Sequence, residues 1–175
     1  MVPSSPPSER HLVLVGMMGS GKTSVGRLVA RRLGRAFLDS DEQIEARTGR
    51  TVREIFEVDG EATFRALEAD VLADALARPE AAVIAAAGGV VLDADNRRRL
   101  RDQATVVWLR ADPEVLAARV RSGDHRPLLT HDPLAVLERM ETARGPLYRE
   151  VADHVVDTGG APVDELVESV LEVAR

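Results

Sequence analysis

Residues 16–23 are Gly-Met-Met-Gly-Ser-Gly-Lys-Thr, or GMMGSGKT, and this stretch decides the fold. It matches the phosphate-binding loop pattern G-x-x-x-x-G-K-[ST] in full. The apolar run at 11–15 before it predicts a short buried strand, and residues 25–33 after it predict a helix. The pattern needs a strand, a glycine-rich loop and a helix in that order, so we expect a nucleotide phosphate site here.

The residue types of this loop suit bound phosphates. Glycines let backbone N–H groups turn toward phosphate oxygens without an intervening Cβ, and the helix start adds unpaired N–H donors. Lys22 can reach the β- and γ-phosphates, and the Thr23 hydroxyl can ligate Mg²⁺. The alternative, a turn without a ligand, is disfavoured by the Lys-Thr pair and the flanking elements. The predicted ATP-binding residues of this segment are Gly19, Ser20, Gly21, Lys22, Thr23 and Ser24.

The composition of the 175-residue chain predicts one globular domain, since 45% of its residues are apolar and 30% are charged. The net charge of −6 argues against sequence-independent nucleic-acid binding, and the lack of cysteine excludes disulfides and thiolate metal sites. No apolar run approaches the about 20 residues of a membrane span. Residues 1–10 lack the apolar core of a signal peptide and predict a flexible tail. We therefore expect a cytoplasmic protein with a single domain at 11–175.

Strand-like apolar runs alternate with helix-like segments, which predicts an α/β fold with a parallel sheet. The expected strands are at 12–15, 36–38, 82–86, 105–109 and 154–156. Helices are expected at 25–33, 41–47, 61–76, 94–101, 133–149 and 163–174. Two more are expected to begin at the Thr51/Glu54 capping box and at Asp112-Pro113. The helix at 133–149 is expected to be interrupted near Gly145-Pro146. Ligands of open parallel sheets bind at the carboxyl ends of strands. Polar or glycine-rich stretches at 16–23, 39–41 and 88–89 follow such ends, which predicts one shared site.

Asp39 and Asp41 flank Ser40 directly after the second expected strand. Alternate residues of an extended chain point to the same side. One carboxylate can then hold Mg²⁺, directly or through water, while the other faces a substrate hydroxyl. The alternative is that Asp39 or Ser40 caps the next helix. The nearby phosphate loop favours the metal and substrate roles.

Several arginines are candidates for anion binding. Arg65 lies between Glu61 and Glu68, so it forms either a solvent-exposed salt-bridge face or a fork for an anionic substrate. Arg126 lies in the polar segment 121–133, which predicts a mobile lid over the transferring phosphates, although an ordinary surface arginine is the alternative.

Three further residues are weaker candidates when each is taken alone. Arg119 can stack on a nucleotide base, and Arg144 can bind a second anionic oxygen. Gly88-Gly89 offers bare N–H groups to a ligand or forms only a tight turn.

Together these stretches resemble shikimate kinase, a family of small P-loop kinases of aromatic amino acid biosynthesis. The resemblance covers nearly the whole chain and rests on the order and spacing of GMMGSGKT, FLDSD, FRALE, AGG, RPLL and RGPLYR. It implies a three-layer P-loop kinase fold with a five-stranded parallel sheet of order 2-3-1-4-5, flanked by helices. It also implies transfer of the γ-phosphoryl group of ATP to the 3-hydroxyl of shikimate, with Mg²⁺ as cofactor and a monomeric enzyme.

The resemblance implies a role for each matching residue. On the ATP side, Lys22 contacts the β- and γ-phosphates, Thr23 and Asp39 serve Mg²⁺, Arg119 flanks the adenine, and Arg126 closes over the phosphates. On the shikimate side, the region at about 40–70 contributes Asp41, which holds the hydroxyls as either a base or an orienting group. Arg65 and Arg144 grip the carboxylate, and Gly88 with Gly89 faces the ring. Lys22, Asp41 and Arg126 are the expected catalytic residues.

The sequence departs from the family pattern at two places, and it disfavours three rival functions. Ala87 stands where the family usually has a first of three glycines, and residues 157–160 hold no basic residue for adenine. Another small-molecule kinase, for gluconate or a nucleotide, would not need Asp41 together with two arginines. A GTPase switch would need an Asn-Lys-x-Asp motif, which the sequence lacks. A nucleotide-binding subunit without catalysis leaves the aspartates and arginines unexplained.

Overall fold

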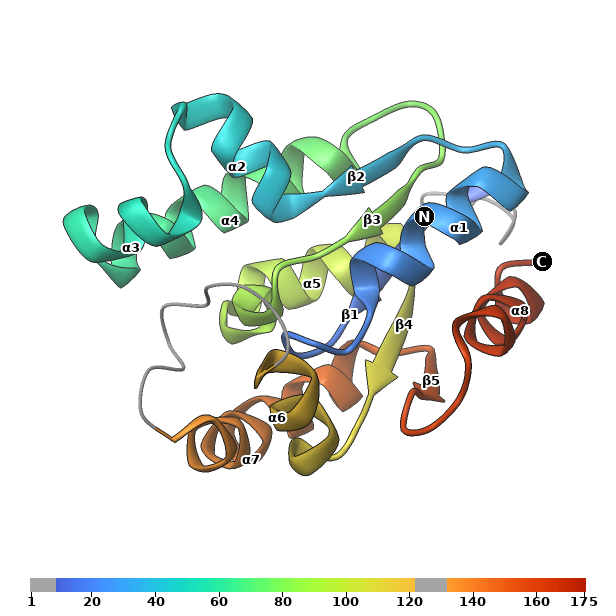
Figure 1. Cartoon of the computed structure of the whole chain (residues 1–175). Helices are drawn as coiled ribbons and strands as arrows, with labels where there is room; N and C mark the ends of the chain where they lie inside the picture. The colour runs from blue at the N-terminus through green and yellow to red at the C-terminus, as the bar shows by residue number, and fades with distance from the viewer. Residues whose placement is uncertain (1–8, 122–131) are drawn as a thin grey trace.

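A computed structural model describes residues 9–121 and 132–175 of the chain. The strands are β1 (His11–Val15), β2 (Phe37–Asp39), β3 (Val83–Ala85), β4 (Ala104–Arg110) and β5 (His154–Asp157). All neighbouring strands run parallel, in the order β2-β3-β1-β4-β5, which confirms the predicted sheet (Figure 1). Most of the predicted tail, at 1–8, and of the predicted lid with Arg126, at 122–131, lies outside the described residues.

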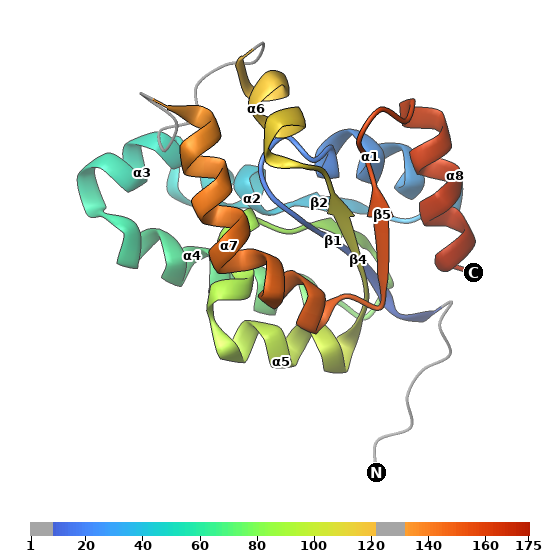
Figure 2. The same ribbon diagram turned by 90° about the horizontal axis from the view of Figure 1, so that it is seen from below.

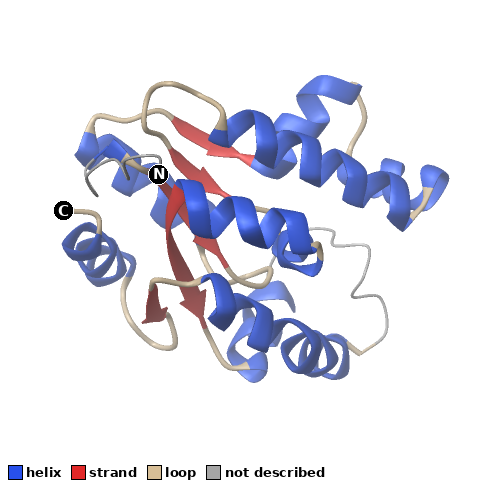
Figure 3. Cartoon of the chain, turned by 180° about the vertical axis from the view of Figure 1, so that it is seen from behind, coloured by secondary structure: helices blue, strands red, loops and turns tan. Residues whose placement is uncertain are grey.

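Helices cover both faces of the sheet, so the domain has three layers (Figures 2 and 3). One face packs against α1 (Lys22–Leu33) and α8 (Val163–Val173). The other face packs against α4 (Glu61–Leu76), α5 (Ala94–Gln103), α6 (Pro113–Arg121) and α7 (Pro133–Val151). Side chains of β1 alternate between the two cores, with Val13 on one side and Leu14 on the other. The whole of β1 is buried, as expected of a central parallel strand.

A third, smaller core lies beside β2, outside the two cores of the sheet (Figure 1). It joins α2 (Ser40–Thr48), α3 (Val52–Asp59) and α4. Its buried members are Ile44, Ile55, Phe64 and Val71. The predicted capping box of Thr51 and Glu54 begins α3. We call this group the satellite unit; it places one end of α2 and one face of α4 next to the carboxyl end of β2.

Helix α7 runs without interruption through Gly145 and Pro146, so the predicted break there was wrong. A proline inside a helix costs about 3 kcal/mol because it removes a hydrogen bond and crowds the preceding turn. Tertiary packing outweighs that cost, because Arg144, Tyr148 and Val151 of the same helix are buried.

Two boundaries near the expected site also differ from the sequence-based expectation. Helix α1 begins at Lys22, because Gly21 takes a left-handed conformation (φ 96°) as its N-cap. Gly88 and Gly89 begin a short 3-10 helix, η2 (Gly88–Leu92), where a tight turn was one expectation. None of the described helices combines the length and apolarity needed to cross a membrane.

Candidate active site

A cavity of about 950 Å³ opens at the carboxyl ends of the central strands. It brings together every predicted site residue that the structure describes. These residues are Gly19, Ser20, Gly21, Lys22, Thr23, Ser24, Asp39, Asp41, Arg65, Gly88, Gly89, Arg119 and Arg144. The described candidates therefore share one cavity, whereas their roles, and the placement of Arg126, stay predictions.

The phosphate-binding loop keeps its shape through glycines in backbone conformations that other residues rarely adopt. Gly16, Gly19 and Gly21 all have positive φ values between 81° and 145°. A Cβ atom on Gly16 would lie only 2.5 Å from the backbone oxygen of Leu109, so the loop is wedged against β4. The first turn of α1 carries no acidic residue of its own, and its positive end faces the cavity.

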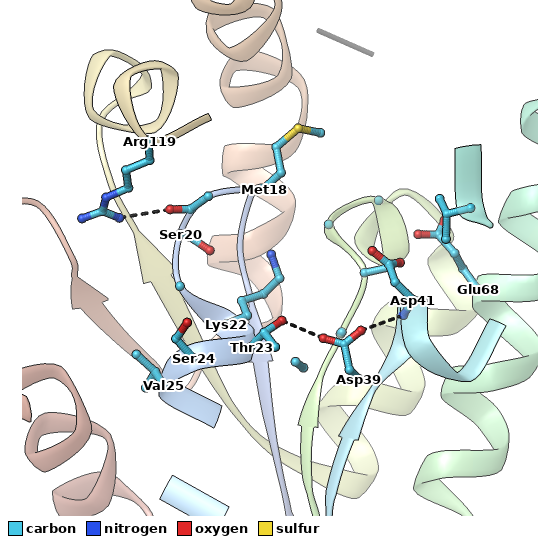
Figure 4. Close-up of a pocket in the computed structure, with 18 of the residues that line it drawn as sticks. Met18, Ser20, Lys22, Thr23, Ser24, Val25, Asp39, Asp41, Glu68 and Arg119 are labelled. Atoms are coloured by element: carbon cyan, nitrogen blue, oxygen red, sulfur yellow. Dashed lines mark hydrogen bonds between the residues drawn. The ribbon is translucent and has the colours of Figure 1, made fainter. Parts of the chain in front are cut away.

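The side chain of Lys22 lies across the loop from which it comes (Figure 4). Its Nζ donates hydrogen bonds to the carbonyl oxygens of Gly16, at 2.7 Å, and Met17, at 3.0 Å. These bonds hold the ammonium group close to the loop amides. A cation at this point neutralises the charge of a phosphate chain bound by the same loop.

Asp39 joins the phosphate loop to α2 and caps that helix, which was the alternative expected from the sequence, while its Mg²⁺ role stays a prediction. Its Oδ1 accepts hydrogen bonds from the backbone N–H groups of Asp41, at 3.0 Å, and Glu42, at 3.2 Å, so it caps the helix. Its Oδ2 accepts a 2.7 Å hydrogen bond from the Thr23 hydroxyl (Figure 4). A carboxylate and a hydroxyl next to a phosphate loop are hard oxygen ligands of the kind that suit Mg²⁺.

The side chains labelled in Figure 4 come from two sides of the cavity. Figure 4 places Asp41 and Glu68 across the cavity from Ser20 and Arg119. Arg119 donates to the Gly19 carbonyl, at 3.1 Å, and to the Thr158 carbonyl, at 2.6 Å. Arg119 thus ties the loop to the residue that follows β5.

Arg65 lines the cavity and also forms ion pairs, while its role as a fork for an anionic substrate stays a prediction. It pairs with the exposed Glu61 at 3.2 Å and with Glu68, only 2% exposed, at 2.5 Å. Burial raises the pKa of Glu68, and the charge of Arg65 opposes that shift. Burial by itself would lower the pKa of Arg65, but the Glu68 carboxylate leaves it above its ordinary value. The pair therefore holds a charged guanidinium at the cavity wall.

Gly88 and Gly89 allow close approach of cationic side chains. A Cβ atom on Gly89 would lie 1.9 Å from Nη1 of Arg65, which no side chain tolerates without displacement. A Cβ atom on Gly88 would lie 3.5 Å from Nη1 of Arg144. The glycine pair is therefore more than a turn, because both guanidinium groups pack directly against it.

Sequence reasoning missed two buried residues that support this site, Tyr148 and Thr158. The Tyr148 hydroxyl donates a 2.6 Å hydrogen bond to the Gly88 carbonyl. The Thr158 hydroxyl accepts a 3.1 Å hydrogen bond from Arg119. The position of Tyr148 four residues after Arg144 was a usable signal, because such residues share one face of a helix.

Comparison with known proteins adds a family and several relatives. A family model described as shikimate kinase matches residues 18–175. The shikimate kinase of Burkholderia pseudomallei (strain 1710b) is 51% identical over 162 residues, which cover 92% of this chain and 88% of that protein. The shikimate kinase of Bordetella pertussis (strain Tohama I) is 48% identical over 166 residues, which cover 94% and 78% respectively.

Solved structures similar to this chain include a shikimate kinase and a gluconokinase. A shikimate kinase from Acinetobacter baumannii, in complex with shikimate, matches with a TM-score of 0.90 and 39% identity over 96% of each chain. A gluconokinase from Sinorhizobium meliloti 1021 matches with a TM-score of 0.64 and 21% identity, covering 95% of this chain and 91% of that one. The second likeness is one of fold alone.

Proposed function

The chain belongs to the shikimate kinase family, and on that premise we propose that its cavity holds ATP and shikimate side by side. The chain is an ATP-dependent shikimate kinase. It transfers the γ-phosphoryl group of ATP to the 3-hydroxyl of shikimate, giving shikimate 3-phosphate and ADP, on the route to chorismate and the aromatic amino acids. The observation that carries the two-substrate site is that a phosphate loop and a pair of arginines line one cavity.

One side of the cavity, which we call the donor half, binds ATP. It consists of residues 19–24 with Asp39 and Arg119. The loop amides and Lys22 contact the phosphates, and Arg119 flanks the adenine. Thr23 and Asp39, whose side-chain oxygens lie 2.7 Å apart, are the residues that would hold Mg²⁺. The ion, when bound, neutralises charge on the phosphates.

The opposite side, which we call the acceptor half, binds shikimate. It consists of Asp41, Arg65, Gly88, Gly89 and Arg144. Two guanidinium groups suit one carboxylate, because each offers several N–H donors in a planar fork. Asp41 takes the hydroxyls, and backbone N–H groups of the glycine pair face the ring. Arg65, held by Glu68, and Arg144, only 7% exposed, support this assignment.

Catalysis in this arrangement comes from positioning and charge stabilisation. Phosphoryl transfer passes through a loose transition state. It is stabilised by a hydroxyl placed in line with the breaking bond and by cations around the transferred group. Asp41 orients the 3-hydroxyl or accepts its proton, and Lys22 stabilises the phosphates. Arg126, assigned from the sequence alone, is proposed to cover them from the lid. The groups named all come from one chain, and we propose a monomer that works in the cytoplasm.

An assay of ADP release with Mg·ATP tests this function against its rivals. The acceptor panel contains shikimate, gluconate and nucleoside monophosphates. We expect turnover with shikimate and background rates with the others, because only shikimate combines a carboxylate with a polyol ring of this size. Turnover with another acceptor, together with none for shikimate, would contradict the proposal.

A further inference from the structure

Tyr148 is the one tyrosine of the chain and lies beside the acceptor half. Its side chain is fully buried (0% exposed), and it follows Arg144 by one turn of α7. One face of this helix therefore presents a cavity-lining arginine and, next to it, a buried hydroxyl. That hydroxyl donates its 2.6 Å hydrogen bond to Gly88, which lies 60 residues away in the sequence.

We propose that Tyr148 is a positioning residue for shikimate: its hydroxyl fixes the Gly88–Gly89 peptide in place against Arg144. The inference rests on the proposed function, in which Gly88, Gly89 and Arg144 contact shikimate. A peptide unit is planar, and in its trans form the C=O and the N–H point in opposite directions. Anchoring the Gly88 carbonyl therefore also sets the direction of the Gly89 N–H group.

The surroundings of Tyr148 keep its hydroxyl from moving. Its ring packs against Trp108 of β4, with ring centroids 5.6 Å apart and the planes tilted by 30°. Trp108 is only 2% exposed, so the two rings form part of the core. The hydroxyl is thus held by the sheet on one side, while α7 fixes its distance from Arg144.

Gly88 lies at a crowded point, where the acceptor half meets the phosphate loop. A Cβ atom there would lie 3.3 Å from the Gly16 oxygen, 3.5 Å from Nη1 of Arg144 and 3.6 Å from the Tyr148 hydroxyl. Glycine removes the side chain but also makes the peptide free to rotate. The Tyr148 hydrogen bond supplies the restraint that the glycine itself lacks.

The protonation state of Tyr148 suits this role. Burial raises the pKa of Tyr148 to about 12, although the charge of Arg144 opposes the shift. The hydroxyl therefore keeps its proton at neutral pH and remains a donor. Without it, the half-buried Gly88 carbonyl would lose this hydrogen bond, and the peptide would be less restrained.

The substitution Tyr148→Phe tests the proposal, because it keeps the ring and its contact with Trp108 and removes only the hydroxyl. We expect the shikimate KM and Kd to rise about tenfold, while the KM for Mg·ATP stays within about twofold. Shikimate binding is measured through the emission of Trp108, the single tryptophan of the chain. The matched control is Thr142→Val on the exposed side of α7, whose hydroxyl bonds only to Glu138 within its own helix; it should change neither constant.

A parallel variant, Arg144→Lys, separates failure of this inference from failure of the proposed site. A raised shikimate KM in Arg144→Lys with an unchanged one in Tyr148→Phe would overturn the positioning role alone. Unchanged values in both variants would overturn the assignment of the acceptor half as well. Equal losses for ATP and shikimate in Tyr148→Phe would show general loosening and also overturn the proposal.

A second measurement needs no substitution at this position. Growth with fluorotyrosine labels the wild-type enzyme at Tyr148 alone, because the chain has no other tyrosine. We expect shikimate to shift the fluorine resonance more than ADP does, since shikimate is the substrate proposed to contact the Gly88–Gly89 peptide. A resonance that does not respond to saturating shikimate would overturn the proposal.

Discussion

The donor and acceptor halves of the cavity are built in different ways. Most of the donor half comes from a single stretch, whose shape depends on local glycine conformations and on Lys22 bonding to its own loop. The acceptor half takes its groups from α2, α4, η2 and α7, and buried partners such as Glu68 and Tyr148 hold them. The proposed phosphate site is therefore built mainly by one segment, whereas the proposed acceptor site depends on the assembled fold.

The largest expected effect comes from Asp41→Asn, which alters the acceptor half alone. We expect kcat to fall about a thousandfold, as for loss of a catalytic acid or base, with ADP affinity unchanged. A coupled assay measures the first quantity and calorimetric titration with ADP the second. Glu42→Gln, at the neighbouring exposed carboxylate that pairs with Arg27, is the control and should keep full activity. Near-normal turnover in Asp41→Asn would rule out the role assigned to Asp41. Lost ADP binding would show that a change in the acceptor half also disturbs the donor half.

The reverse experiment is Lys22→Met, which alters the donor half. We expect kcat to fall a few hundredfold, the size of effect seen when one transition-state donor is removed. Shikimate affinity, measured by Trp108 emission in the absence of nucleotide, should stay within about twofold. Arg31→Gln, an exposed residue on the same helix, serves as the control. A parallel loss of shikimate affinity would mean that the loop also shapes the acceptor half.

A smaller effect is expected from Gly89→Ala, because the new Cβ must displace the Arg65 guanidinium from its place beside Glu68. We expect the shikimate KM to rise about tenfold and the free energy of unfolding to fall by about 1 kcal/mol, at the low end for overpacking. The KM for Mg·ATP should not change. Gly145→Ala is the control, since its Cβ would meet only the Glu141 side chain, at 3.3 Å. Equal kinetics for the two variants would contradict the packing explanation.

The smallest effect concerns neither half, because His11 lies at the start of β1, away from the cavity. Burial lowers the pKa of His11, although hydrogen bonds to the backbone at Arg78 and Leu76 oppose the shift. Its Nδ1 accepts a 3.1 Å hydrogen bond from the Ala82 N–H, which protonation would break. The folded state thus disfavours the charged imidazole, so its contribution to stability is complete above about pH 6.5 and falls as the pH drops through the lower folded pKa.

Denaturant unfolding of the wild type and His11→Gln between pH 7.5 and pH 5 measures this contribution. The wild type should lose more stability across that range than the variant, because only the wild type takes up this proton on unfolding. Equal slopes for the two proteins would contradict the assignment. The wild type and His11→Gln should have the same ratio of ATP affinity to shikimate affinity, because His11 lies away from the cavity.

Most of the donor half could be located from the sequence because residues 19–24 are contiguous. The spacing of Gly16, Gly21 and Lys22 requires one strand–loop–helix geometry, and the alternation of strands and helices placed Asp39 and Gly88 at the same edge of the sheet. Family resemblance supplied the roles of Arg65 and Arg144. The residue pattern alone left open whether Arg65 was an ordinary salt-bridge partner. In the structure, Arg65 forms an ion pair with Glu68 and also lines the cavity.

The supporting contacts were not predictable, because they depend on long-range packing. Nothing local to Tyr148 indicates that its hydroxyl reaches Gly88, and nothing local to Thr158 indicates contact with Arg119. The same limit explains the wrong expectation for α7. Proline at 146 argues for a break on local grounds, but burial of neighbouring side chains keeps the helix whole.

The satellite unit has a consequence for how enzymes of this fold diverge. Ile44, Ile55, Phe64 and Val71 form a core that is separate from the two cores of the sheet. None of these four side chains belongs to the two cores that pack on the strands beneath the phosphate loop. A lineage can therefore change the shape of α2 and α4, and with it the molecule that is phosphorylated, while it inherits the nucleotide site intact.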